Sequence, residues 1–236
     1  MPKYIEQLVD EQLRRSEISR RAAEERLGGR PIPPDVPRII TISRQLGSGG
    51  RIVAEILSER LGWSLWDREL VDAIAENTAL RRSVVESFDE KTVSEIEALT
   101  RTLMGQPEVG GFMYKRHLTR VVLSIAKRGN AVILGRGANF LLPKALNVRI
   151  EASEKIRIAN MIRVERLTRE EAVERIHRSD RERAAFTRQV FNKDVEDCRS
   201  YDIVMQADCF TLEQAAEIIL AAARIRFPEL AAPLKP

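Results

Sequence analysis

Thr41-Ile-Ser-Arg-Gln-Leu-Gly-Ser-Gly-Gly-Arg-Ile-Val-Ala54 runs from a short apolar segment through a glycine-rich turn into an amphipathic pattern. It predicts a strand, a tight loop and a helix that begins near Gly50. Gly47, Gly49 and Gly50 allow the positive φ angles that turn successive backbone N–H groups toward one concavity, and a helix N-terminus adds free N–H groups. The loop is therefore a candidate phosphate cradle, although an ordinary strand–helix turn is an equally frequent use of this pattern.

The loop departs from the usual phosphate-binding pattern G-x-x-x-x-G-K-[ST]. When Gly50 and Arg51 are set on the G-K pair, Gln45 takes the first glycine position. Ile52 then stands where the hydroxyl that binds Mg²⁺ belongs, and the loop has no lysine. Support for a binding role must therefore come from the rest of the chain.

The composition limits the class of protein. The 236 residues carry a formal net charge of +4, two cysteines and two histidines, with no Cys or His pair at metal-ligand spacing. The chain is long enough for one main domain without a disulfide or a structural metal. The N-terminus is charged and no apolar stretch is long enough for a membrane span, so we expect a soluble, cytoplasmic protein with no membrane partner. Acidic residues interleave with the arginines, which makes nucleic-acid binding unlikely.

Apolar segments alternate with helical patterns after residue 38. The segments 39–42, 63–66, 131–134, 148–150 and 203–205 predict an α/β domain over 38–228, with an open five-stranded parallel sheet of the P-loop type flanked by helices. Capping-box spacings predict helix starts at Thr92, Thr168 and Thr211. A helical insertion is expected over about 68–128, with breaks at 105–107 and 110–111, and an arginine-rich lid over about 168–199.

The two ends of the chain lie outside this domain. Residues 1–27 predict a charged helix with a thin apolar seam from Tyr4 to Leu27. Residues 28–37 form a Pro/Gly linker that cannot continue the helix, and residues 229–236 a C-terminal tail. We expect the helix to pack on its own domain or on a second subunit, which leaves a homo-oligomer or a partner contact open.

Polar residues follow three of the predicted strands, where parallel sheets bind their ligands. Ser43 and Arg44 follow the first strand, Asp67 the second, and Arg136 stands between two glycines after the third. Each has a structural alternative, because Asp67 is also a good helix N-cap and Arg136 also suits an exposed turn. Farther on, arginines recur every three residues at 175, 178 and 181, which indicates either a phosphate-binding row or a solvated helix face.

Taken in order, these motifs resemble the cytidylate kinase-like family of P-loop proteins over about residues 38–226. The resemblance is carried by Ile42-Ser-Arg-Gln-Leu-Gly-Ser-Gly-Gly-Arg51, Trp66-Asp-Arg-Glu-Leu70, Leu134-Gly-Arg-Gly-Ala138, Arg178-Ser-Asp-Arg-Glu-Arg183 and Tyr201-Asp-Ile-Val204. It implies phosphoryl transfer from ATP, with Mg²⁺, to a nucleoside monophosphate, with CMP or dCMP as the expected acceptor. The third motif lacks the two acids of the family's Asp-Gly-Arg-Asp, because it reads Leu-Gly-Arg-Gly over residues 134–137.

The resemblance also implies roles for individual residues. The ATP phosphates would be bound by Ser43, Arg44, Gly47, Ser48, Gly49, Gly50 and Arg51, with Arg51 or Arg44 supplying the charge of the missing lysine. Catalytic arginines would be Arg51, Arg136, Arg178, Arg181 and Arg183. The acceptor would contact Asp67, Arg136 and Arg188, and Mg²⁺ would contact Ser48 and Asp67. The missing lysine and Ile52 leave one alternative open, a catalytically weak or inactive nucleotide-binding regulatory module.

Overall fold

A single parallel sheet organises the protein. The computed structural model describes residues 3–26, 38–85, 88–104 and 112–230. The sheet has the order β2-β3-β1-β4-β5, and all its pairings are parallel. Its strands are β1 (Ile39–Arg44), β2 (Ser64–Trp66), β3 (Ala131–Leu134), β4 (Leu146–Glu151) and β5 (Ile203–Gln206). The five predicted strands are confirmed, although β2 begins one residue later than expected and β4 is longer at both ends.

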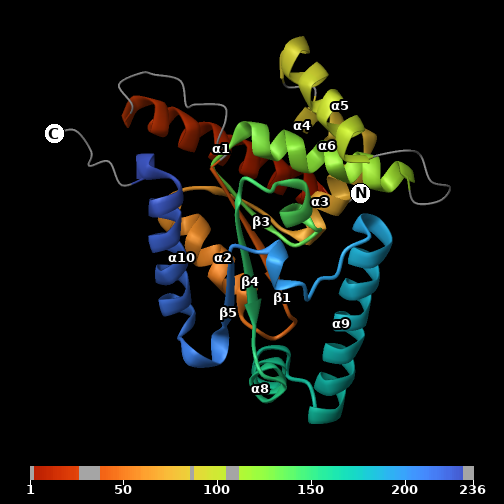
Figure 1. The fold of residues 1–236 in the computed structure, drawn as a ribbon, viewed down its shortest axis with the longest axis vertical. Helices are drawn as coiled ribbons and strands as arrows, with labels where there is room; N and C mark the ends of the chain where they lie inside the picture. Colours follow the sequence, from red (N-terminus) through yellow and green to blue (C-terminus); the bar gives the residue numbers. More distant parts are fainter. Residues whose placement is uncertain (1–2, 27–37, 86–87, 105–111, 231–236) are drawn as a thin grey trace.

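Helices cover both faces of the sheet (Figure 1). Successive residues of a strand point to opposite faces, so Ile39 packs into one core and Ile40 into the other. Helices α2 (Gly50–Leu61) and α10 (Leu212–Arg226) lie on the Ile40 face. The Ile39 face is covered by α1 (Lys3–Arg26), α3 (Arg68–Glu76), α4 (Thr78–Val85), α5 (Glu90–Met104), α6 (Phe112–Arg128) and α7 (Ala138–Leu141).

Two further helices lie at the carboxyl end of the sheet. Helix α8 (Glu154–Glu165) follows β4, and α9 (Arg169–Phe191) runs back beside the sheet, as Figure 1 shows. They pack on each other through a small separate core that contains Ile158, Met161 and Ile176. The region of about 168–199, predicted as an arginine-rich lid, contains α9 of this hairpin.

Two of the three predicted helix starts are confirmed. Thr168 and Thr211 each form a full capping box with the residue three positions on. The prediction at Thr92 is wrong, because α5 begins at Glu90 and the Asp89 carboxylate accepts a hydrogen bond from the Thr92 N–H at 2.8 Å. Aspartate is as good an N-cap as threonine and comes first along the chain. The breaks predicted at 105–107 and 110–111 lie outside the described residues.

The N-terminal helix is built into the main core. Val9 of α1 has no exposed surface and belongs to the same core as α3 and α6. Gln12 accepts a hydrogen bond from the Leu65 N–H at 2.8 Å, so α1 also covers the free edge of β2. An uncovered edge strand invites pairing with another chain, and α1 blocks this edge. Leu27 of the predicted seam and the linker 28–37 lie outside the described residues.

None of the helices in the described part of the chain contains a stretch that is apolar and long enough to cross a bilayer.

The burial of α1 predicts a clear difference between two of its apolar residues. Val9→Ala removes two fully buried methyl groups, so we expect it to lower the free energy of unfolding by about 1.5–3 kcal/mol. Ile18→Ala is the control, because Ile18 is 68% exposed and its loss should change stability by less than about 0.5 kcal/mol. Urea denaturation measures both, and equal effects would contradict the packing of α1 described here.

Candidate active site

The candidate site lies where the sheet topology leaves a crevice. After β1 the chain continues to β2, at one edge of the sheet, and after β4 it continues to β5, at the opposite edge. Ligands of open parallel sheets bind at the carboxyl ends of strands whose connections diverge in this way. Arg44 ends β1, the glycine-rich loop follows it, and Arg149 lies near the end of the neighbouring β4.

The glycine-rich loop is held from its outer side. Gly47 and Gly49 both have φ of +80°, and Gly49 is the N-cap of α2. The Leu46 carbonyl accepts a hydrogen bond from Arg157 Nε at 2.7 Å, and the Gly47 carbonyl accepts one from Asn160 Nδ2 at 2.8 Å. The Gln45 and Ser48 N–H groups donate to backbone carbonyls, whereas those of Gly47, Gly49 and Gly50 do not and are left for the cavity that the loop lines.

Arg157 links the loop to α9. Its guanidinium is 5% exposed and donates to both Asp180 carboxylate oxygens at 2.8 Å, in addition to the Leu46 carbonyl. A buried cation is stable only with such partners, so Arg157 binds the loop and α9 at once. The position of the loop therefore depends on the α8–α9 hairpin.

Two adjoining cavities open beside the loop. The loop cavity, of about 900 Å³, lies against Gly47, Gly49 and Gly50, one side of α3, and the α8–α9 hairpin. The arginine cavity, of about 330 Å³, lies between the end of β3, the end of β4 and α9. Five residues line both: Arg44, Gln45, Arg68, Glu182 and Arg183. Two arginines from distant segments thus stand with Arg44 at the junction of the cavities.

Arg44 and Arg183 form the electropositive centre of this junction. Arg183 Nη1 donates to the Arg44 carbonyl, and in the described part of the chain neither guanidinium has a carboxylate at ion-pair distance. Burial first, and the Arg183 charge second, lower the pKa of Arg44 to about 9. Burial lowers the pKa of Arg183 to about 10. Both remain cationic at neutral pH, so the junction holds positive charge that an anion would neutralise.

Arg136 occupies an unusual backbone conformation. Its φ is +54°, and its neighbours Gly135 and Gly137 also have positive φ, whereas residues other than glycine seldom adopt this region. The guanidinium donates to Asp72 and lies 4.5 Å from the centre of the Phe186 ring on α9. Such local strain is found most often at functional sites.

Asp72 interacts with three side chains. It accepts from Arg136, forms an ion pair with Arg68 at 3.7 Å, and accepts from the Tyr114 hydroxyl at 2.8 Å. Burial raises the pKa of Tyr114, which therefore stays a hydroxyl donor. The carboxylate thus orients two arginines of the arginine cavity from α3.

Two site residues were not singled out from the sequence. Arg149 is 4% exposed, lines the arginine cavity, and donates to Glu151 at 2.6 Å and to Ser43 at 3.2 Å. The sequence feature that could have identified Arg149 is a charged residue between two apolar residues of a strand that is largely buried. Arg68 lines both cavities and directly follows Asp67, inside a motif that carried the family resemblance.

Three of the residues predicted to bind the ATP phosphates or Mg²⁺ are already engaged with other groups of the protein. Arg51 lines the loop cavity but pairs with Glu55 at 3.2 Å and Asp67 at 3.4 Å. Asp67 also accepts from the Leu70 N–H, so it caps α3. Ser48 is 1% exposed, lines neither cavity, and its hydroxyl donates to the Gln45 carbonyl at 2.9 Å.

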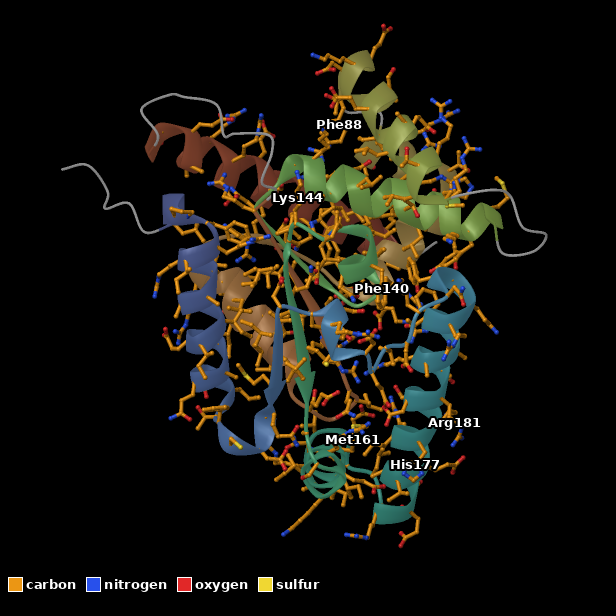
Figure 2. All side chains as sticks on the ribbon, viewed as in Figure 1. Phe88, Phe140, Lys144, Met161, His177 and Arg181 are labelled. Atoms are coloured by element: carbon orange, nitrogen blue, oxygen red, sulfur yellow. The ribbon has the colours of Figure 1, made fainter. Side chains whose placement is uncertain are left out.

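The predicted lid arginines separate into two groups. Arg178 lines the loop cavity together with Arg183. Arg181 lines neither cavity, and Figure 2 shows it on the outer side of α9, pointing away from the sheet. Arg188 is exposed and lies 4.0 Å from Asp194, also outside both cavities. The three-residue repeat drifts around the helix, so 175 and 178 face the cavity and 181 does not.

Comparison with known proteins places the chain. A family model described as the cytidylate kinase-like family matches residues 39–208. The chain belongs to this family. A sequence comparison with curated proteins finds no match.

Solved structures similar to this chain have low sequence identity to it. An uncharacterised protein from Eubacterium ventriosum is 20% identical, with 78% of this chain and 97% of that chain covered and a TM-score of 0.56. A shikimate kinase from Bacteroides thetaiotaomicron is 14% identical, with 78% and 96% covered and a TM-score of 0.43. The family match at residues 39–208 supports a nucleotide kinase-like protein.

Two glycines with positive φ provide a matched test of the loop. A Cβ at Gly47 would lie 2.7 Å from the Arg157 carbonyl oxygen, whereas a Cβ at Gly62 meets nothing within 4 Å. We expect Gly62→Ala to cost only the backbone strain, about 1–2 kcal/mol of stability, with unchanged ATP binding. Gly47→Ala should also displace the loop and weaken ATP binding at least about tenfold, measured by calorimetry. Equal ATP affinity in the two variants would contradict a binding role for the loop.

Proposed function

We propose that the protein transfers a phosphoryl group from ATP to a nucleoside monophosphate, with CMP or dCMP as the acceptor. The observation that carries the proposal is the junction of two cavities at Arg44 and Arg183, one cavity against the glycine-rich loop and the other lined by arginines. A phosphoryl donor and a phosphorylated acceptor need two anion sites that meet at one point. Membership of the cytidylate kinase-like family supports the same reading.

The donor site in this proposal is the loop cavity. The N–H groups of the loop and the N-terminus of α2 receive the ATP phosphates, because both offer hydrogen-bond donors and positive potential. Arg178 and Arg183 reach this cavity from α9 and add charge from the lid side. The clamp of Arg157 and Asn160 keeps the loop in place before the nucleotide arrives.

The acceptor site is the arginine cavity. Arg68 and Arg136, both held by Asp72, bind the monophosphate of the acceptor, and Arg149 lies under it at the end of β4. Phe186, Asn139 and Glu196 offer an aromatic face, an amide and a carboxylate to the base and sugar. The choice of CMP or dCMP rests on the family alone.

The transfer needs positioning and charge, and no covalent intermediate on the protein. An oxygen of the acceptor monophosphate forms the new bond to the γ-phosphorus, and the bond between that phosphorus and the β–γ bridging oxygen breaks to release ADP. Charge spread over the transferred group is stabilised by fixed cations, which is the main contribution of kinases to the rate. Arg44 and Arg183 lie where the two cavities join and supply these cations.

Mg²⁺ would accompany ATP in this reaction, and the chain offers few ligands for it. In the described residues no three Asp, Glu, His or Cys side chains come together as a metal site, and the Ser48 hydroxyl is used within the loop. Asp67 is one of several carboxylates that border the loop cavity, and it lies beside Arg51. This donor set suits an ion held mostly by the nucleotide phosphates and water, with Asp67 in contact through water, as is common for Mg²⁺.

One observation favours a second candidate function, a nucleotide-binding regulatory module. Arg51 is paired with Glu55 and Asp67, and the Ser48 hydroxyl is bound to Gln45, so neither predicted loop ligand is free. A protein of this kind would bind ATP without transferring its phosphate.

Release of ADP distinguishes the two functions. Purified protein is supplied with ATP and Mg²⁺ and, separately, with CMP, dCMP, UMP, AMP and GMP, alongside a control without acceptor. We expect ADP release that depends on the acceptor and is fastest with CMP or dCMP. ATP binding without acceptor-dependent ADP release would favour the regulatory module and contradict the kinase.

Arg136 provides a test of the acceptor site. Arg136→Ala removes the charge that we place on the acceptor phosphate, so the KM for the acceptor should rise by about tenfold or more while ATP affinity stays within about twofold. Arg224→Ala, on the exposed side of α10, is the control and should change neither constant. Steady-state kinetics measure the split, and an unchanged acceptor KM would refute the assignment.

A further inference from the structure

The loop geometry fixes how this chain aligns with the lysine-containing pattern. Gly49 needs to be glycine because of its backbone, since its φ is +80° and it caps α2. Gly50 lies in the first turn of α2 and is not among the residues with positive φ. The second glycine of G-x-x-x-x-G-K-[ST] is therefore Gly49, one residue earlier than the sequence alone suggested.

This shift changes the residue at three other positions of the pattern. Gly50 now stands at the lysine of the pattern, and Arg44 stands at its first glycine. Arg51, not Ile52, takes the place of the hydroxyl residue. Compared with the usual loop, the cation and a glycine have exchanged places.

The structure brings these two positions together. A Cβ placed on Gly50 would lie 2.6 Å from the Arg44 Cβ and 3.1 Å from its Cγ. Gly50 therefore lacks a side chain because the stem of Arg44 passes over it. The other end of the same side chain passes close to a second glycine: a Cβ on Gly135, whose φ of +83° itself favours glycine, would lie 2.5 Å from Arg44 Nη1. Two glycines from distant parts of the chain thus form a seat for one arginine.

The seat directs the guanidinium to the junction of the cavities. Arg44 lines both the loop cavity and the arginine cavity, and no carboxylate of the described residues is at ion-pair distance from it. Its nearest cations include Arg183, which binds its carbonyl. A half-buried cation without an anionic partner is unfavourable for folding, so its retention indicates a ligand that supplies the negative charge.

We propose that Arg44 performs the work of the absent P-loop lysine, binding the ATP phosphates at the point of transfer from a seat formed by Gly50 and Gly135. This inference rests on the proposed function, and it assigns the role to Arg44 rather than to Arg51. Arg51 points to Glu55 and Asp67, so its charge is already neutralised.

Arg44→Met tests the assignment with two independent readouts. We expect kcat to fall by about 10²- to 10³-fold, the usual effect of losing one charge-stabilising donor. We also expect the midpoint of thermal unfolding without nucleotide to rise by about 2–4 °C, because an unpartnered charge is removed from a half-buried position. Arg51→Met should lower kcat by less than about threefold, since exposed pairs contribute little. Arg60→Met is the control: Arg60 pairs with Glu217 outside both cavities and its loss should leave kcat unchanged.

The outcomes separate this inference from the proposed function. Wild-type protein that binds ATP and transfers phosphate while Arg44→Met does so equally well would overturn the role of Arg44 and leave the kinase intact. A lower unfolding midpoint for Arg44→Met would show that Arg44 serves the fold and would also overturn it. Wild-type protein with no ATP binding at all would refute the kinase and this inference together.

Exchanging the two residues gives the most specific test. Arg44→Gly combined with Gly50→Lys rebuilds the usual loop, with the cation on the helix and the glycine at the end of β1. We expect this double variant to recover at least about tenfold in kcat over Arg44→Gly alone. No recovery in a double variant that unfolds at the wild-type temperature would contradict the exchange.

Discussion

The site depends on one unfavourable interaction, the burial of the Arg44 guanidinium beside other cations. The pKa of Arg44 falls to about 9, with burial as the main cause and Arg183 next, and no carboxylate in the described structure compensates it at ion-pair distance. A side chain on Gly50 would collide with the Arg44 Cβ, and the guanidinium of Arg44 passes close to Gly135. The fold tolerates this charge because the parallel sheet and its two cores supply stability elsewhere. In our account, the phosphates of a bound nucleotide complete the interaction.

A second constraint keeps the loop ready for that ligand. Arg157, almost fully buried, binds the Leu46 carbonyl on one side and Asp180 on the other, so the loop and the lid hairpin share one anchor. A loop held by its carbonyl groups needs little rearrangement to present its N–H groups, which lowers the entropic cost of binding. On the acceptor side, Asp72 holds Arg68 and Arg136 in a similar way. Several arginines of the two cavities are thus oriented by acids, whereas Arg44 and Arg183 at the junction are not.

The sequence predicted the architecture well because the five strands are short apolar runs. Few folds are compatible with strands and helices that alternate along the chain. It missed the start of α5, since Asp89 and Thr92 are both good caps and only packing chooses between them. The site was harder to predict. Which arginine of the α9 row faces the cavity depends on helix rotation, which places Arg178 inside and Arg181 outside. The alignment of the loop with the lysine-containing pattern depended on whether Gly49 or Gly50 has a positive φ. Backbone angles of adjacent glycines cannot be read from the sequence.

The most direct measurement is a crystal structure of the protein with Mg²⁺ and a non-hydrolysable ATP analogue. Our account predicts the β- and γ-phosphates within hydrogen-bond distance of the loop N–H groups, with the Arg44 guanidinium on the same phosphates and Arg51 still paired with Asp67. Phosphates bound by Arg51, with Arg44 turned away from them, would contradict the exchange of cation and glycine. Phosphates bound outside the loop cavity would contradict the account as a whole.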